Sequence, residues 1–183
     1  MVSTETPICD FNQAAIEFNL KGVDGNYYSL DSVKGQNGLL VMFICNHCPY
    51  VKSVIYRIIR DTNELKGLGV NSVAIMSNDP SEYEEDSFVN MQKIAIDMNF
   101  PFPYLIDETQ DIAKSYGAVC TPDFFGYNKN FGLQYRGRLD ESRKELVKDA
   151  RRDLFEAMKV IAITGVGPEN QIPSMGCSIK WFD

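Results

Sequence analysis

Apolar residues recur along the chain with two different periods, and this pattern predicts alternating strands and helices. Continuous apolar runs at Gly38–Ile44 and Val70–Met76 are typical of strands that are covered on both faces. Between them, apolar residues repeat at three- and four-residue spacing from Val51 to Leu65, which predicts an amphipathic helix ending near Gly67–Gly69. A strand, a helix and a second strand in this order form a parallel crossover unit. The pattern therefore predicts an α/β fold with Gly38–Ile44 at its centre.

Shorter elements are predicted on either side of this unit. The turn residues Val23–Asn26 predict a β-hairpin between Ala15–Leu20 and Tyr27–Ser29. A capping-box pattern at Ser81–Glu84 predicts a second crossover helix, with an apolar face formed by Phe88, Met91, Ile94 and Ala95. Next, the pattern predicts a short strand, a short helix, a second hairpin and a last long helix, at Pro103–Ile106, Gln110–Tyr116, Asp123–Gly137 and Arg143–Ile163. With residues 165–183 as an irregular tail and no linker or repeat, we expect one domain over residues 1–183.

Composition and charge narrow the class of protein. The chain has 183 residues, of which 44% are hydrophobic and 23% charged, which fits a single globular domain. Its 18 Lys and Arg against 25 Asp and Glu give a net charge of −7, which disfavours nucleic acid because binding phosphates needs an excess of cations. The first residues lack the basic region and apolar run of a secretory signal. The longest apolar stretch of the chain is only as long as a strand, which is too short to span a bilayer. We therefore expect a soluble, cytoplasmic protein with no membrane partner.

The segment Cys45-Asn46-His47-Cys48-Pro49 lies where the central strand is expected to end and the long helix to begin. N–H groups at a helix start have no intrahelical partner and the helix dipole is positive there, so the pKa of a thiol falls. Two intervening residues bring the sulfurs close enough to bridge, and a reversible disulfide lets one Cys attack a substrate while the other resolves the mixed disulfide. His47, the only histidine, is expected to lower the pKa of the neighbouring thiol.

Four separated features occur in one order between Ala15 and Asp140: Phe18-x-Leu20 running on to Ser29-Leu30, the Cys motif, Ser77-Asn78-Asp79, and Ala118-Val119-Cys120-Thr121-Pro122. This order resembles the thioredoxin fold, and specifically the redoxin branch that includes the alkyl hydroperoxide reductase and thiol-specific antioxidant (AhpC/TSA) family. The resemblance implies a mixed central sheet flanked by helices, with an N-terminal β-hairpin extension. It also implies that Thr121 and Pro122 form the cis-proline loop that faces the redox cysteines and docks substrate.

Two departures from the resembled pattern bear on mechanism. Thioredoxin has a buried Asp six residues before its first Cys, and Leu39 stands at that position here. Cys48-Pro49 looks like a peroxidatic Cys followed by Pro, which would begin the helix with Cys48 as N-cap, but Cys45 stands where the peroxiredoxin pattern has a Thr. We expect thiol–disulfide exchange in which Cys45 attacks, Cys48 resolves and His47 tunes. The alternative is a peroxidase in which Cys48 is oxidised by peroxide.

The exchange hypothesis implies protein or small-molecule thiol and disulfide substrates, together with a reductase or oxidase as partner. A copper or zinc module is a second class, because two thiolates and an imidazole lie within four residues. Structural zinc needs four ligands, however, and no second Cys/His cluster supplies the rest. We therefore expect no metal and no other cofactor.

Other residues leave alternatives open. Cys120 and Cys177 are candidate auxiliary thiols, and burial as small apolar side chains is the alternative for both. Cys9 is expected to be incidental. Five carboxylates are expected to be solvated and stabilised by the dipole of a helix start, with a metal site as the alternative: Asp79, Glu82, Glu84, Glu85 and Asp86. Three later residues are expected to form surface ion pairs, with contact to a partner as the alternative: Arg136, Arg138 and Asp140.

Overall fold

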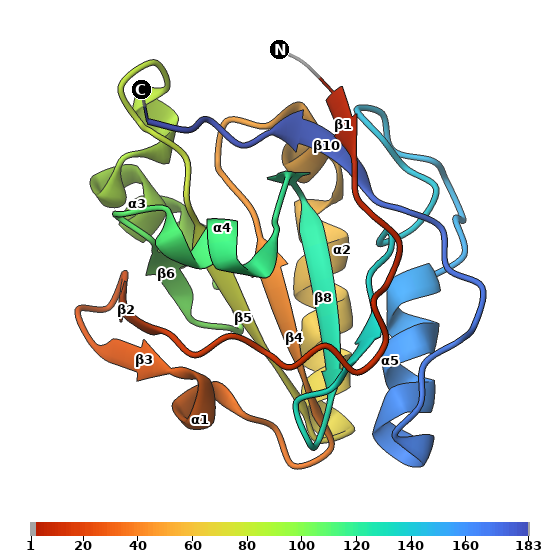
Figure 1. The fold of residues 1–183 in the computed structure, drawn as a ribbon. Coiled ribbons are helices and arrows are strands. Elements are labelled where there is room, and N and C mark those ends of the chain that lie inside the picture. The colour runs from red at the N-terminus through yellow and green to blue at the C-terminus, as the bar shows by residue number, and fades with distance from the viewer. Residues whose placement is uncertain (1–2, 183) are drawn as a thin grey trace.

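Strand β4 (Gly38–Phe43) is the centre of the sheet in the computed structural model, which describes residues 3–182 (Figure 1). It pairs in parallel with β5 (Val70–Met76) and antiparallel with β8 (Asp123–Asn128). The other strands of this sheet are short: β2 (Asn19–Gly22), β3 (Tyr27–Ser29), β6 (Tyr104–Ile106) and β9 (Leu133–Tyr135). The strand order is β3-β2-β6-β5-β4-β8-β9, which confirms the mixed central sheet of a thioredoxin-like α/β fold.

Helices cover both faces of the sheet because the buried side chains of β4 alternate between two apolar clusters. Leu40 and Met42 pack in a cluster with the helices α2 (Pro49–Gly67), α3 (Phe88–Asp97) and α5 (Asp153–Thr164). Leu39, Val41 and Phe43 pack on the opposite face, with α1 (Leu30–Val33) and α4 (Asp111–Tyr116). A strand buried on both faces must be apolar throughout, which is why the run at residues 38–44 identified it.

Most local patterns predicted their elements correctly. The N-terminal hairpin forms with Gly25 in a left-handed conformation at its turn, although its first strand begins at Asn19 and not at Ala15. The predicted capping box at Ser81–Glu84 is wrong. That segment leads into a 3-10 turn at Glu84–Asp86, and the cap of α3 is Ser87, whose hydroxyl accepts a hydrogen bond from the Asn90 N–H.

The last helix begins at Asp153, ten residues later than the pattern over Arg143–Ile163 predicts. Asp149 has a φ of 58°, which no helix continues through, and Leu146 is 55% exposed, so the apolar residues before Asp153 face no core. The helix begins after Arg152, whose guanidinium lies 2.6 Å from the buried Asp61 carboxylate of α2. A tertiary ion pair therefore sets the start of α5 against the local periodicity.

A second, three-stranded sheet corrects the expectation of an irregular tail. Strand β10 (Met175–Ser178) pairs antiparallel with both β1 (Ser3–Glu5) and β7 (Cys120–Thr121). Figure 1 shows β10 and β1 crossing above the N-terminal end of α2, and β10 contacts that helix. The two ends of the chain therefore close over the segment between β4 and α2.

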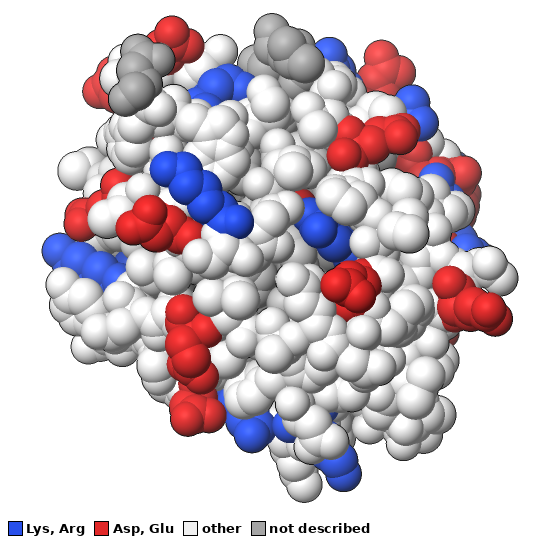
Figure 2. Space-filling model, in the orientation of Figure 1, with Lys and Arg blue, Asp and Glu red and all other residues white. Residues whose placement is uncertain are grey.

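On the face drawn in Figure 2, acidic and basic side chains are interspersed, and neither kind forms a continuous charged patch. None of the helices within residues 3–182 is both long and apolar enough to span a bilayer.

We predict that Gly176→Ala detaches β10 from β7, because a Cβ at this position would lie only 2.1 Å from the Thr121 carbonyl oxygen. Overpacking of this kind costs about 1–3 kcal/mol. Urea unfolding should show that loss. The control is Gly67→Ala at the end of α2, where a Cβ meets no described atom within 4 Å. Equal stability of the two variants would contradict the close packing of β10.

Candidate active site

The segment between β4 and α2 positions Cys48 at the start of the helix. Cys48 is the N-cap, with an extended backbone (φ −65°, ψ 122°), and Pro49 is the first helical residue. Proline disfavours helical geometry in the residue before it and needs no N–H partner at the first helical position. The Cys-Pro pair therefore fixes the helix start where the sequence predicts it, with the Cys48 sulfur beside unpaired helix N–H groups.

Four of the predicted site residues meet in one buried cluster. The Cys45 Sγ lies 3.2 Å from the Thr121 Oγ1, and the Cys48 Sγ lies 3.1 Å from the Thr121 carbonyl oxygen. The Cys177 Sγ lies 2.8 Å from the Cys48 Sγ, from a residue 129 positions further along the chain. Cys45, Cys48 and Cys177 are each at most 2% exposed. Within residues 3–182 the cysteines are thiols, with no disulfide between them.

The peptide bond between Thr121 and Pro122 is cis, as the resemblance implies. Thr121 stands directly opposite Cys177 in the pairing of β7 with β10. The loop expected to dock substrate is therefore covered by the C-terminal strand, and the Cys45 sulfur faces that loop while the residue is only 1% exposed.

The contacts in this cluster shift the pKa values of Cys48 and Cys45 in opposite directions. The hydrogen bonds that Cys48 makes with Cys177 and Cys45 lower the pKa of Cys48 and outweigh burial, which raises it. The Thr121 carbonyl oxygen opposes this effect because it can only accept, but the Val51 N–H and the helix start also stabilise the thiolate. Burial and the bond to Cys48 raise the pKa of Cys45. The contacts of the cluster therefore favour loss of the proton from Cys48 before Cys45.

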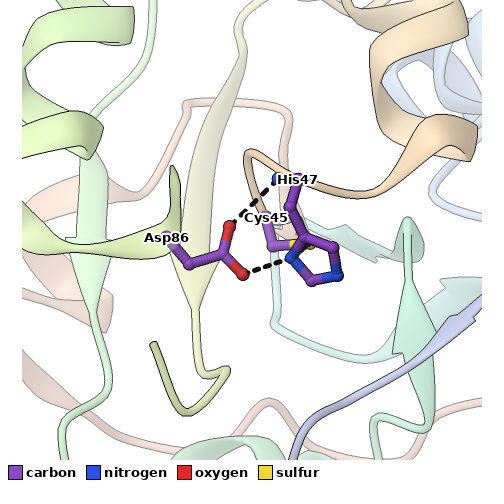
Figure 3. Close-up of side chains that lie close together, drawn as sticks. All are labelled: Cys45, His47 and Asp86. Carbon is purple, nitrogen blue, oxygen red and sulfur yellow. Dashed lines mark hydrogen bonds and ion pairs between the residues drawn. The ribbon is translucent and has the colours of Figure 1, made fainter. Parts of the chain in front are cut away.

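Asp86 fixes the position of His47 and of the motif backbone (Figure 3). One carboxylate oxygen accepts from the His47 Nδ1 at 2.5 Å and from the Asn78 side chain at 3.0 Å. The other accepts from the backbone N–H groups of Asn46 at 2.8 Å and His47 at 3.1 Å. Burial raises the pKa of Asp86, but the bonds from His47 and Asn78 outweigh it and hold the pKa below 3.8.

The His47 ring contacts a different thiol from the one expected. Its Nδ1 lies 3.6 Å from the Cys45 Sγ, whereas the sequence places His47 next to Cys48. Tyr83 stacks on the ring at 3.9 Å between centroids, and the Nε2 is buried with no hydrogen-bond partner among residues 3–182. Because the His47 Nδ1 already donates to Asp86, it is less available to stabilise a thiolate on Cys45.

Cys45, His47 and Asp86 also place three groups of metal-ligand type within 4.8 Å of one another. All four acceptor sites on the Asp86 carboxylate are already occupied by donors. A metal ion would have to displace these bonds, and three ligands are fewer than structural zinc takes. The cluster therefore fits a hydrogen-bonded network better than a metal centre.

Comparison with known proteins identifies the family of this chain. The family model described as "AhpC/TSA family" matches residues 11–142. The chain belongs to the AhpC/TSA family. With its thiols gathered at a helix start, this AhpC/TSA protein is a thiol-based oxidoreductase of thioredoxin-like fold.

Solved structures similar to this AhpC/TSA protein include two of nearly equal length. An uncharacterized conserved protein from Geobacillus kaustophilus is 43% identical, with a TM-score of 0.93 over 100% of this chain and 97% of that one. A hypothetical protein from Sinorhizobium meliloti is 34% identical, with a TM-score of 0.92 over 98% of both chains. Peroxidoxin BcpB from Mycobacterium tuberculosis is 12% identical, with a TM-score of 0.62 over 88% and 100%, and shares the fold alone. No curated protein matches.

Other charged residues of the AhpC/TSA protein lie deeper than the sequence suggested. Asp86, expected in a solvated helix start, is fully buried and is the acidic residue that sequence reasoning missed. No periodicity sets it apart from its exposed neighbours. Arg136 and Asp140 do form ion pairs, with Asp123 at 3.0 Å and with Arg57, but both are buried and not at the surface.

The two remaining cysteines lie apart from the sulfur contacts described above. Cys120 is buried on β7, with its Sγ 3.7 Å from the Pro122 carbonyl oxygen, and burial raises the pKa of its thiol. Cys9 is half-buried, and burial raises its pKa to about 11. Both thiols are therefore protonated at neutral pH.

We predict that Asp86→Asn destabilises the fold at pH 7 by about 3 kcal/mol, because it leaves buried donors of His47 and the loop without a charged acceptor. A carboxyl with a depressed pKa stabilises the folded state above its unfolded pKa of about 3.9, and this contribution is lost as the pH falls through the folded pKa. The variant should therefore lose less stability than the wild type on going from pH 7 to pH 3.

Urea unfolding at several pH values measures this effect. The exposed Glu82→Gln removes a nearby carboxylate and serves as the control. If Asp86→Asn and Glu82→Gln have the same pH dependence, Asp86 does not hold the motif in the way described.

Proposed function

We propose that the protein catalyses thiol–disulfide exchange through a reversible disulfide between Cys45 and Cys48. The observation that carries this proposal is the meeting of both cysteines at Thr121 beside the start of α2, with the Cys45 Sγ 3.2 Å from the Thr121 Oγ1 and the Cys48 Sγ 3.1 Å from its carbonyl oxygen. Their mutual hydrogen bond lowers the pKa of Cys48 and raises that of Cys45. A thiolate beside a protonated thiol is the arrangement in which attack and resolution can follow one another.

The proposed roles reverse the expectation that Cys45 attacks. Cys48 carries the lowered pKa, whereas Cys45 is buried within 4.8 Å of the Asp86 carboxylate, whose charge also raises the pKa of Cys45. Attack therefore falls to the Cys48 thiolate, and resolution falls to Cys45.

The proposed thiol–disulfide exchange takes place in two steps. The Cys48 thiolate attacks a substrate disulfide, forms a mixed disulfide and releases one substrate thiolate. Cys45 then attacks the Cys48 sulfur, gives its proton to that thiolate and releases the second substrate thiolate. Two electrons pass from the dithiol to the substrate. A reducing partner of the thiol class returns the protein to its dithiol form.

Peroxide reduction is a second candidate, favoured by one observation. Cys48 is an N-cap followed by Pro49 and has a lowered pKa, which suits oxidation by peroxide to a sulfenic acid. Against it, Cys45 stands where the peroxidase pattern has a Thr, so the hydroxyl of that pattern is missing. We therefore place exchange first.

We predict that Cys48→Ser lowers the rate of disulfide reduction by at least about 100-fold, because the thiolate is lost. The double variant Cys45→Ser/Cys177→Ser, which leaves no other thiol in contact with Cys48, should instead accumulate a mixed disulfide between Cys48 and a small disulfide such as oxidised glutathione. Stopped-flow turnover and mass spectrometry of acid-quenched samples measure both effects. Cys9→Ser, a cysteine outside the cluster, is the control.

Three results would contradict this scheme. A mixed disulfide trapped on Cys45 in Cys48→Ser would restore Cys45 as the attacking thiol. Peroxide turnover faster than disulfide turnover, lost in Cys48→Ser, would make the protein a peroxidase. Stoichiometric copper or zinc in protein purified without chelator, with no exchange activity, would favour the metal-binding class.

A further inference from the structure

Strand β10 brings a third sulfur to Cys48. The Cys177 Sγ lies 2.8 Å from the Cys48 Sγ, closer than the Thr121 carbonyl oxygen at 3.1 Å. A disulfide bond is about 2.05 Å long, so an approach of roughly 0.8 Å would join the two sulfurs. Local sequence does not bring them together, since they come from α2 and from the C-terminal strand.

Hydrogen bonds on both sides hold β10 in a fixed register. Before the strand, Ser174 donates its N–H to the Thr6 hydroxyl at 3.0 Å and its own hydroxyl to the Pro122 carbonyl at 2.8 Å. After it, the Lys180 N–H donates to the Asn78 side chain at 3.0 Å. Within it, Gly176 packs so closely on Thr121 that no side chain fits. The backbone therefore specifies the contact between Cys177 and Cys48.

Cys48 lies between two thiols that can each reach its sulfur. It is hydrogen-bonded to Cys45 on one side and to Cys177 on the other. One sulfur forms one disulfide at a time, so a Cys45–Cys48 bond and a Cys48–Cys177 bond exclude each other. Attack of Cys177 on the Cys48 sulfur of an oxidised motif breaks the first bond and forms the second. The proton of Cys177 passes to the departing Cys45 thiolate, and no net oxidation takes place.

We propose that Cys177 is a third redox thiol of the site and that its disulfide with Cys48 locks strand β10 over the motif. This proposal rests on the proposed function in one respect, namely that Cys48 is the reactive thiolate. The Cys48–Cys177 form ties the C-terminal strand to the start of α2 and keeps substrate from the Thr121-Pro122 loop. The Cys45–Cys48 form leaves β10 attached by hydrogen bonds alone.

The first test maps disulfides after equilibration in glutathione buffers, by trapping thiols with an alkylating agent and mass spectrometry of peptides. Oxidised Cys45→Ser should contain a Cys48–Cys177 bond in most molecules, whereas Cys177→Ser should contain only Cys45–Cys48. Cys120→Ser, a buried neighbour on β7, is the matched control and should behave as the wild type. Cys177→Ala replaces Cys177→Ser if the buried hydroxyl impairs folding.

The outcomes separate this proposal from the proposed function. If Cys177→Ser forms Cys45–Cys48 but Cys45→Ser carries only glutathione on Cys48 with Cys177 alkylated, the third thiol is overturned and the exchange mechanism stands. If Cys48 is unmodified in every variant, both are overturned.

The second test measures amide hydrogen exchange of residues 175–178 in Cys45→Ser, reduced and oxidised. A disulfide that locks β10 should slow exchange by at least about tenfold, because opening of the strand then needs the bond to break. The double variant Cys45→Ser/Cys177→Ser is the control, and its amide hydrogens at residues 175–178 should exchange at the same rate in the reduced and the oxidised protein. Equal rates in reduced and oxidised Cys45→Ser would overturn the locking role.

Discussion

The burial of Cys48, a thiol whose pKa its surroundings lower, is the constraint that organises this site. A charge removed from water is costly unless donors and dipoles surround it. For the thiolate form of Cys48, the hydrogen bonds with Cys177, Cys45 and the Val51 N–H supply that stabilisation, together with the dipole of the helix start. The donors come from the loop after the central strand, from the long helix and from the C-terminal strand. The same contacts that stabilise the charge therefore join three parts of the chain.

The strand that stabilises Cys48 also covers it, so it limits the access of substrate to this thiol. Strand β10 supplies the Cys177 donor, and it also pairs with Thr121, the residue expected to face substrate. A cavity of about 90 Å³ adjoins the same loop and is lined by Tyr50, Pro122 and Ser174 among others. The proposed exchange with a protein disulfide therefore requires β10 to move, and the strand is short enough, at four residues, for local opening.

The site also places its acidic residue differently from thioredoxin. Leu39 occupies the β4 position at which thioredoxin has its buried Asp, and it packs in the apolar cluster on the opposite face from α2. Asp86 approaches from the turn before α3 and contacts His47 and the motif backbone. Its charge is satisfied by four donors, so it orients the loop more than it accepts protons. This difference fits a mechanism in which the proton of Cys45 leaves with the substrate.

The sequence by itself determined the central sheet, the long helix and the Cys-Pro start of that helix. Continuous apolar runs, helical spacing and a proline at the first helical position act over a few residues, so they can be read locally. Only the tertiary structure decided that Asp86 is buried, that Arg152 starts α5 and that β10 covers the motif. Each of these depends on a partner far along the chain: His47 39 residues away from Asp86, Asp61 91 residues from Arg152, and Cys48 129 residues from Cys177. Met175–Ser178 has no alternation of its own that predicts a strand. It becomes one because β1 and β7 offer unpaired backbone groups on either side, and that pairing brings the third thiol to Cys48.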